Sequence, residues 1–168
     1  MALCVVFNYA QWKKIIYLVT AFTIGHSITL ALAALKIVII NRNIVEFLIP
    51  ITIIITCIIN FANKEDTENV NKNSKVRYLV ALSFGLIHGL GFSSLLLSLL
   101  GREENIIIPL LAFNIGLEIG QVLIVIASVA IAYIFINYFK IKFREWILIV
   151  CGIISGFALK ILETNWIF

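Results

Sequence analysis

The sequence predicts an all-α integral membrane protein, a single domain over residues 1–168 built from a bundle of about five transmembrane helices. Hydrophobic residues make up 62% of the chain and only 13% of the residues are charged, whereas a soluble domain carries about a quarter charged residues. The apolar residues form runs long enough to cross a bilayer, which takes about 20 residues of helix. None of these runs alternates polar with apolar residues, as a membrane-spanning strand does.

Five runs qualify as spans, and they cover Ile15–Ile40, Ile44–Ala62, Tyr78–Leu100, Ile106–Phe139 and Trp146–Leu162. A short polar turn at residues 41–43 separates the first run from the second. The hydrophilic stretch 63–77 follows the second run, and its Asn, Lys and Glu content predicts a solvated loop. At about 1.5 Å per residue the fourth run is too long for one straight crossing, so it must tilt, protrude or begin at the interface near Pro109.

Lysine and arginine residues are divided unevenly between the two sides of the predicted bundle. Nine fall on the side of the N-terminus, namely Lys13, Lys14, Lys64, Lys72, Lys75, Arg77, Lys140, Lys142 and Arg144. Four fall on the other side, namely Lys36, Arg42, Arg102 and Lys160. Because basic loops stay in the cytoplasm, the N-terminus is predicted to be cytoplasmic and the C-terminus to lie across the membrane. The basic residues form no stripe or patch of the kind that binds nucleic acid, so no nucleic-acid partner is expected.

Three ionisable side chains, His26, His88 and Glu118, fall deep inside separate spans. Counted along a helix from the nearest loop charge, they lie about 18, 17 and 21 Å into the membrane. All three depths are close to the centre of a hydrocarbon core about 30 Å thick. A charged group there costs about 2.5 kcal/mol or more unless it is paired or hydrated. We therefore expect the three side chains to face one another inside the bundle.

Polar neighbours accompany these residues at helical spacing. Thr23 and Ser27 lie one turn apart beside His26, and Asn114 and Gln121 share a face with Glu118. Three pairs of glycines at the interval that lets membrane helices approach closely lie in the last three spans, and they are Gly85–Gly89, Gly116–Gly120 and Gly152–Gly156.

Three ordered motifs that contain these residues resemble the HupE/UreJ family of hydrogenase and urease accessory membrane proteins. The motifs are TAFTIGHSITL from Thr20, FGLIHGLGF from Phe84 and FNIGLEIGQ from Phe113. The resemblance extends over nearly the whole chain and implies a bacterial inner-membrane permease or accessory factor for nickel, with cobalt or zinc as alternatives. Relatives usually carry an earlier helix with a Gly-x-Asp-His segment. Nothing before His26 supplies it, so we expect a shortened member.

The resemblance and the residue chemistry together assign His26, His88 and Glu118 as metal ligands. Neutral imidazole suits nickel, zinc and copper, and a carboxylate adds charge and an oxygen ligand. Thr23, Ser27, Asn114 and Gln121 are expected to support these ligands or to line the pathway. The metal is expected as substrate or site ion, with no tightly bound cofactor. In the structural alternative the same side chains only hydrogen-bond across helices and fix their packing.

Two further functional classes remain open. Ser27 with His88, or a metal-bound water, suits an intramembrane hydrolase, although transport or an accessory role without catalysis is favoured. A non-transporting assembly factor would use the polar loop 63–77 to bind a maturation protein. The chain has no phosphate-binding Gly-x-x-x-x-Gly-Lys-Ser/Thr motif, so transport would be channel-like or coupled to ions. Five spans are few for a complete pathway, which favours a homo-oligomer.

Overall fold

The computed structural model describes residues 12–38, 40–62, 74–100 and 107–166. Within these ranges every regular element is an α-helix, and the helices are α1 (Trp12–Ala34), α2 (Arg42–Ala62), α4 (Ser74–Leu100), α5 (Ile107–Asn137) and α6 (Phe143–Thr164). Each contains a stretch long and apolar enough to cross a membrane. The predicted class, an all-α integral membrane protein with about five transmembrane helices, is confirmed.

The helix bounds differ from the apolar runs at several ends. α1 ends at Ala34 rather than at Ile40, because Lys36 adopts a left-handed φ of 57° and its N–H donates to Ala33 O over 3.0 Å. Lys140 has the same φ of 57° and follows the end of α5 at Asn137. In both places apolar residues continue beyond the helix, since hydrophobicity alone does not keep the backbone helical.

The prediction of a loop over residues 63–77 is wrong at the C-terminal end of that range. Residues 63–73 lie outside the described residues, but α4 already begins at Ser74. Lys75 and Arg77 are therefore part of a helix of 27 residues. At about 1.5 Å per residue this helix exceeds the thickness of the hydrocarbon core, so its polar first turns can lie in the headgroup region.

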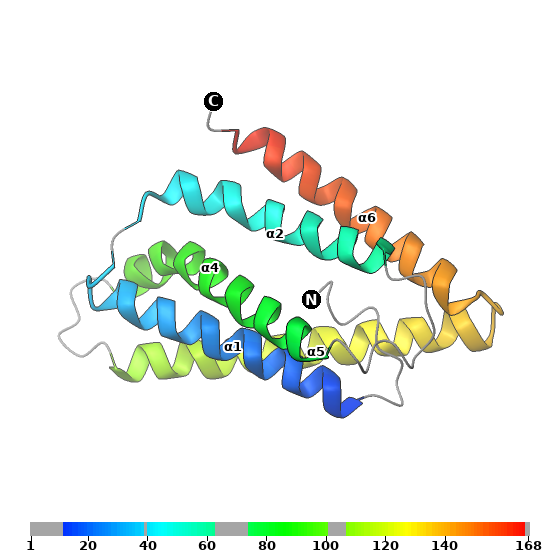
Figure 1. Cartoon of the computed structure of the whole chain (residues 1–168). Coiled ribbons are helices and arrows are strands. Elements are labelled where there is room, and N and C mark those ends of the chain that lie inside the picture. The colour runs from blue at the N-terminus through cyan, green and yellow to red at the C-terminus, as the bar shows by residue number, and fades with distance from the viewer. Residues whose placement is uncertain (1–11, 39, 63–73, 101–106, 167–168) are drawn as a thin grey trace.

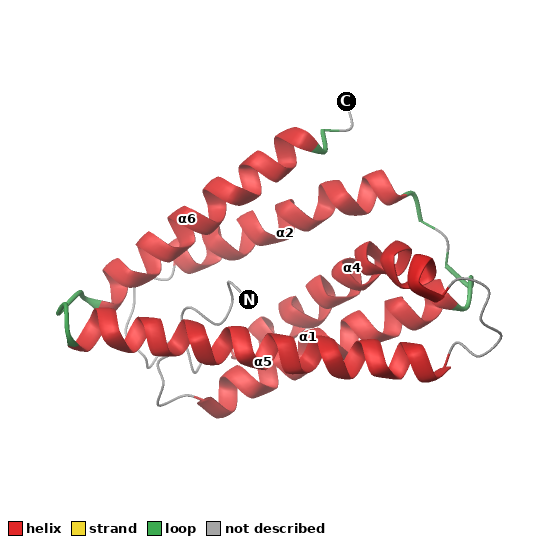
Figure 2. Ribbon diagram, turned by 180° about the vertical axis from the view of Figure 1, so that it is seen from behind, coloured by secondary structure: helices red, strands yellow, loops and turns green. Residues whose placement is uncertain are grey.

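The helices are arranged around a closely packed pair. α1 packs mainly against α4, α2 packs against α4 and α6, and the long α5 runs along α1 (Figures 1 and 2). One cluster of buried side chains joins all five described helices, with α1 contributing Ile15, Leu18 and Val19, and the others Cys57, Ala81, Val125, Ile147 and Cys151. A second cluster, of Leu30, Ala34 and Leu96, lies toward the other end of α1.

α5 and α6 are the outer helices of the bundle. Val125 is the one residue of α5 that is buried, and large apolar side chains such as Ile107, Ile124 and Phe157 are more than half exposed. In water such surfaces would aggregate, whereas lipid tails solvate them. The exposed faces therefore fit a chain that is embedded in a bilayer.

Candidate functional site

Glycine residues bring α1 and α4 into backbone contact. A Cβ added to Gly85 would lie 2.1 Å from Phe22 O, and one added to Gly25 would lie 2.3 Å from Leu82 O. A Cβ on Gly89 would lie 2.3 Å from the backbone oxygen of His26. Each distance is shorter than any tolerated carbon–oxygen contact, so only glycine permits this approach. The crossing places the two histidines, each next to one of these glycines, in the layer between the helices.

His26 is buried at this crossing without polar partners. Its side chain is 1% exposed, and neither ring nitrogen has a hydrogen-bond partner among the described residues. The ring stacks near Phe22 with centroids 6.2 Å apart, and the Phe92 ring meets it edge-on at 5.5 Å. The imidazole is therefore packed against aromatic carbon, and both ring nitrogens are buried without a hydrogen-bond partner among the described residues.

His88 contacts the same phenylalanine. Its ring meets Phe22 edge-on, with centroids 5.3 Å apart, so Phe22 contacts both imidazoles. Its Nε2 lies 3.1 Å from the Thr52 hydroxyl of α2. Thr52 is a site residue that the sequence interpretation missed. The signal was present, because Thr52 and Thr56 are two hydroxyl residues one turn apart in the otherwise apolar stretch 47–59.

Hydroxyl and amide side chains connect α1 to α5. The Ser27 hydroxyl donates to Asn114 Oδ1 over 2.8 Å. The Thr23 hydroxyl lies between Val19 O of its own helix, at 3.0 Å, and Gln121 Oε1 of α5, at 3.1 Å. The two amides therefore hold the helices together, and neither is hydrogen-bonded to a histidine or to Glu118 in the described structure. This arrangement fits the structural alternative for these four residues.

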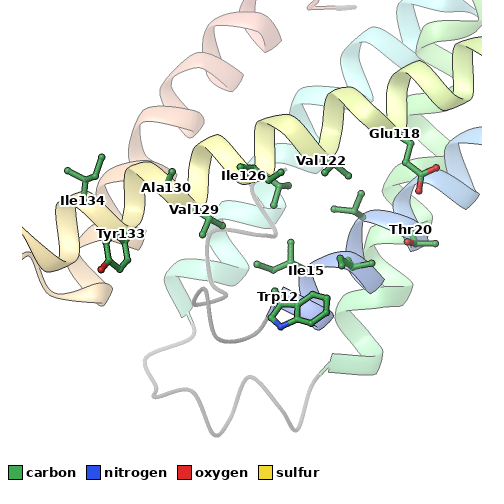
Figure 3. Close-up of a pocket in the computed structure, with 13 residues that line it drawn as sticks. Trp12, Ile15, Thr20, Glu118, Val122, Ile126, Val129, Ala130, Tyr133 and Ile134 are labelled. Atoms are coloured by element: carbon green, nitrogen blue, oxygen red, sulfur yellow. The ribbon is translucent and has the colours of Figure 1, made fainter.

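Glu118 lies apart from the histidines, at one end of a groove between α1 and α5 (Figure 3). The groove has a volume of about 690 Å³, and its lining is almost wholly apolar. Its walls come from the N-terminal half of α1, including Trp12, Ile15 and Thr20, and from α5 between Glu118 and Ile134. The carboxylate is exposed, and within the described residues no hydrogen-bond donor contacts it.

The expected ligands thus occupy two places instead of one. Among the described residues no three His, Cys, Asp or Glu side chains lie close enough to hold one metal ion. The separation follows from the directions of the side chains around α5. Asn114 and Gln121 face α1, whereas Glu118 lies about 40° from Asn114 around the helix and points into the groove. The hydrolase pair is not formed either, since Ser27 is hydrogen-bonded to Asn114 and His88 to Thr52.

The fold and this geometry define a helical integral membrane protein whose core holds two imidazoles at a glycine-lined helix crossing. A model of the HupE / UreJ protein family matches residues 1–167. The chain belongs to the HupE/UreJ family, whose members are accessory proteins for hydrogenase and urease and are associated with nickel and cobalt transport. No curated protein and no solved structure matches the chain.

Proposed function

We propose that this protein is a membrane permease or accessory protein that binds and passes a divalent metal ion, with nickel as the first candidate and cobalt or zinc as alternatives. His26 and His88 are the ligands in the core, and Glu118 is a separate carboxylate position in the groove. Membership of a family associated with nickel and cobalt transport supports the choice of cargo.

The observation that carries the proposal is the buried imidazole of His26, which has no hydrogen-bond partner among the described residues. A buried polar group without a partner costs about 1–3 kcal/mol, and a neutral imidazole has both a donor and an acceptor nitrogen. An apolar residue would fill this position without that cost. Imidazole nitrogen is a preferred ligand of nickel, cobalt and zinc, so a passing metal ion would supply the missing interaction.

Separate ligand positions suit transport better than a closed metal cage. An ion must bind well enough to enter and weakly enough to leave, and several weak positions meet both demands. Glu118 would attract a cation to its end of the groove, and the imidazoles would hold it in the core. Release would then need no more than the loss of one or two ligands.

We propose that the protein lies in the bacterial inner membrane with its N-terminus in the cytoplasm. The nine-to-four distribution of Lys and Arg supports this orientation. Alkaline phosphatase fused after Phe168 should be active, and a fluorescent protein fused there should be dark. The opposite pair of results would contradict the proposed orientation. The homo-oligomer that the small number of spans favours stays a prediction.

The experiment is nickel accumulation in cells that express the wild type, His26→Ala, His88→Ala or Glu118→Gln at matched membrane levels. Ser128→Ala is a suitable control, because Ser128 is exposed and among the described residues its hydroxyl donates only to Ile124 O of its own helix. We expect the wild type and the control to change cellular nickel equally, and the three site variants to lose most of that change. Equal nickel in wild-type and empty-vector cells would contradict transport.

A further inference from the structure

The hydroxyl of Thr52 lies between two partners but has a single proton to give. Its Oγ1 is 2.7 Å from Ile49 O in its own helix and 3.1 Å from His88 Nε2 in α4. A carbonyl oxygen can only accept, so the shorter contact requires the Thr52 proton to point at Ile49 O. The Thr52 oxygen then accepts, and the proton between Thr52 and His88 must belong to Nε2.

This assignment fixes the tautomer of His88. A neutral imidazole carries one proton, so protonated Nε2 leaves Nδ1 with a free lone pair. Nδ1 has no hydrogen-bond partner among the described residues. Thr52 is only 4% exposed, so bulk water does not compete for its hydroxyl.

We propose that Thr52 is a positioning residue that selects the Nε2-protonated tautomer of His88 and thereby presents Nδ1 to the metal ion. The inference rests on the proposed function, since it names the atom through which His88 binds. In proteins, a histidine that binds a metal donates its other N–H to a second residue, which fixes the ring and its tautomer. Thr52 supplies that acceptor from a third helix, α2.

Thr56 offers a matched control on the same helix. It lies one turn from Thr52, is equally buried at 3% exposed, and donates to Thr52 O over 2.8 Å. It makes no hydrogen bond to either histidine in the described structure. Thr52→Val and Thr56→Val therefore remove the same hydroxyl group from similar surroundings, and only the first change reaches His88. Thr52→Ser restores the hydroxyl at the critical position.

The test is ¹⁵N NMR of the full-length protein in lipid nanodiscs with labelled histidine, together with Ni²⁺ titration of the same samples. The chain has two histidines, so His26→Gln assigns the His88 signals. We expect a single Nε2-protonated form of His88 in the wild type, Thr56→Val and Thr52→Ser. Thr52→Val should show a mixture of tautomers and about 10–100-fold weaker Ni²⁺ binding, the usual effect of losing such a partner.

Two results would overturn the proposal. One is a His88 tautomer that is the same in Thr52→Val as in the wild type, and the other is a changed tautomer with unchanged Ni²⁺ affinity. A wild type that binds no Ni²⁺ would instead defeat the proposed function, and the tautomer spectra would still decide whether Thr52 sets the state of His88. Circular dichroism and gel filtration of each variant separate these outcomes from misfolding.

Discussion

At the scale of single residues, the two histidines differ in a way that their positions in the chain do not reveal. Counting residues from the loop charges placed both near the membrane centre, and the structure brings both against Phe22. One imidazole is held by a threonine, and the other has no polar partner in the described structure. Partners on other helices depend on rotation and crossing geometry, which a single sequence does not contain.

This difference leads to opposite predictions for replacement by leucine. His26→Leu removes two buried polar atoms that have no partner within the described part of the chain, so the melting temperature in detergent should stay the same or rise while Ni²⁺ binding is lost. His88→Leu leaves the Thr52 hydroxyl without its interhelical partner and should cost about 1 kcal/mol. Thermal unfolding followed by tryptophan fluorescence measures both. A fall of the melting temperature in His26→Leu that exceeds the fall in His88→Leu would indicate a structural role for His26.

At the scale of helices, three glycine pairs have the spacing that permits a close approach, and in the described structure one of them makes it. Gly85 and Gly89 touch the α1 backbone, whereas a Cβ on Gly116, Gly120, Gly152 or Gly156 would meet nothing within 4 Å in the described structure. The same interval occurs in all three helices, so spacing shows where a helix permits contact but not whether another helix is there. Gly25, an isolated glycine, completes the contact from the α1 side.

Alanine substitutions should therefore separate the glycines into two groups. Gly85→Ala places a methyl group against Phe22 O and should destabilise the bundle by about 1–3 kcal/mol, as overpacking does. Gly152→Ala enters open space and should be neutral or stabilising by up to about 1 kcal/mol, since alanine is the better helix former. Reversible unfolding in mixed micelles measures both. Equal effects of the two changes would contradict the α1–α4 contact.

The α1–α5 contact makes a second prediction at this scale. In a double-mutant cycle, Ser27→Ala and Asn114→Ala should show a coupling energy of about 0.6 kcal/mol, the average for hydrogen bonds between membrane helices. Ser27→Ala combined with His88→Ala should show none, because Ser27 is bonded to Asn114. A coupling energy between Ser27 and His88 that exceeds the one between Ser27 and Asn114 would contradict this contact and would support the intramembrane hydrolase hypothesis.

At the scale of the whole molecule, composition and run length were sufficient for the fold class, and three motifs were sufficient for the family. The hydrophobic effect selects membrane helices by length and apolarity, so these properties can be read residue by residue. Glu118 was expected to face the histidines, but only its depth in the membrane follows from counting residues, whereas its direction around the helix depends on how α1 and α5 pack. The carboxylate consequently faces a groove, away from the imidazole layer.

The central claim is that the imidazoles in the α1–α4 layer bind the metal ion. Nickel K-edge absorption spectroscopy of the purified, nickel-loaded protein tests it most directly, with His26→Gln and His88→Gln as comparisons. The account predicts imidazole scattering in the wild type, and a loss of that scattering or of bound nickel in each variant. Bound nickel without imidazole ligands in the wild type, or spectra and stoichiometry unchanged in both variants, would contradict it.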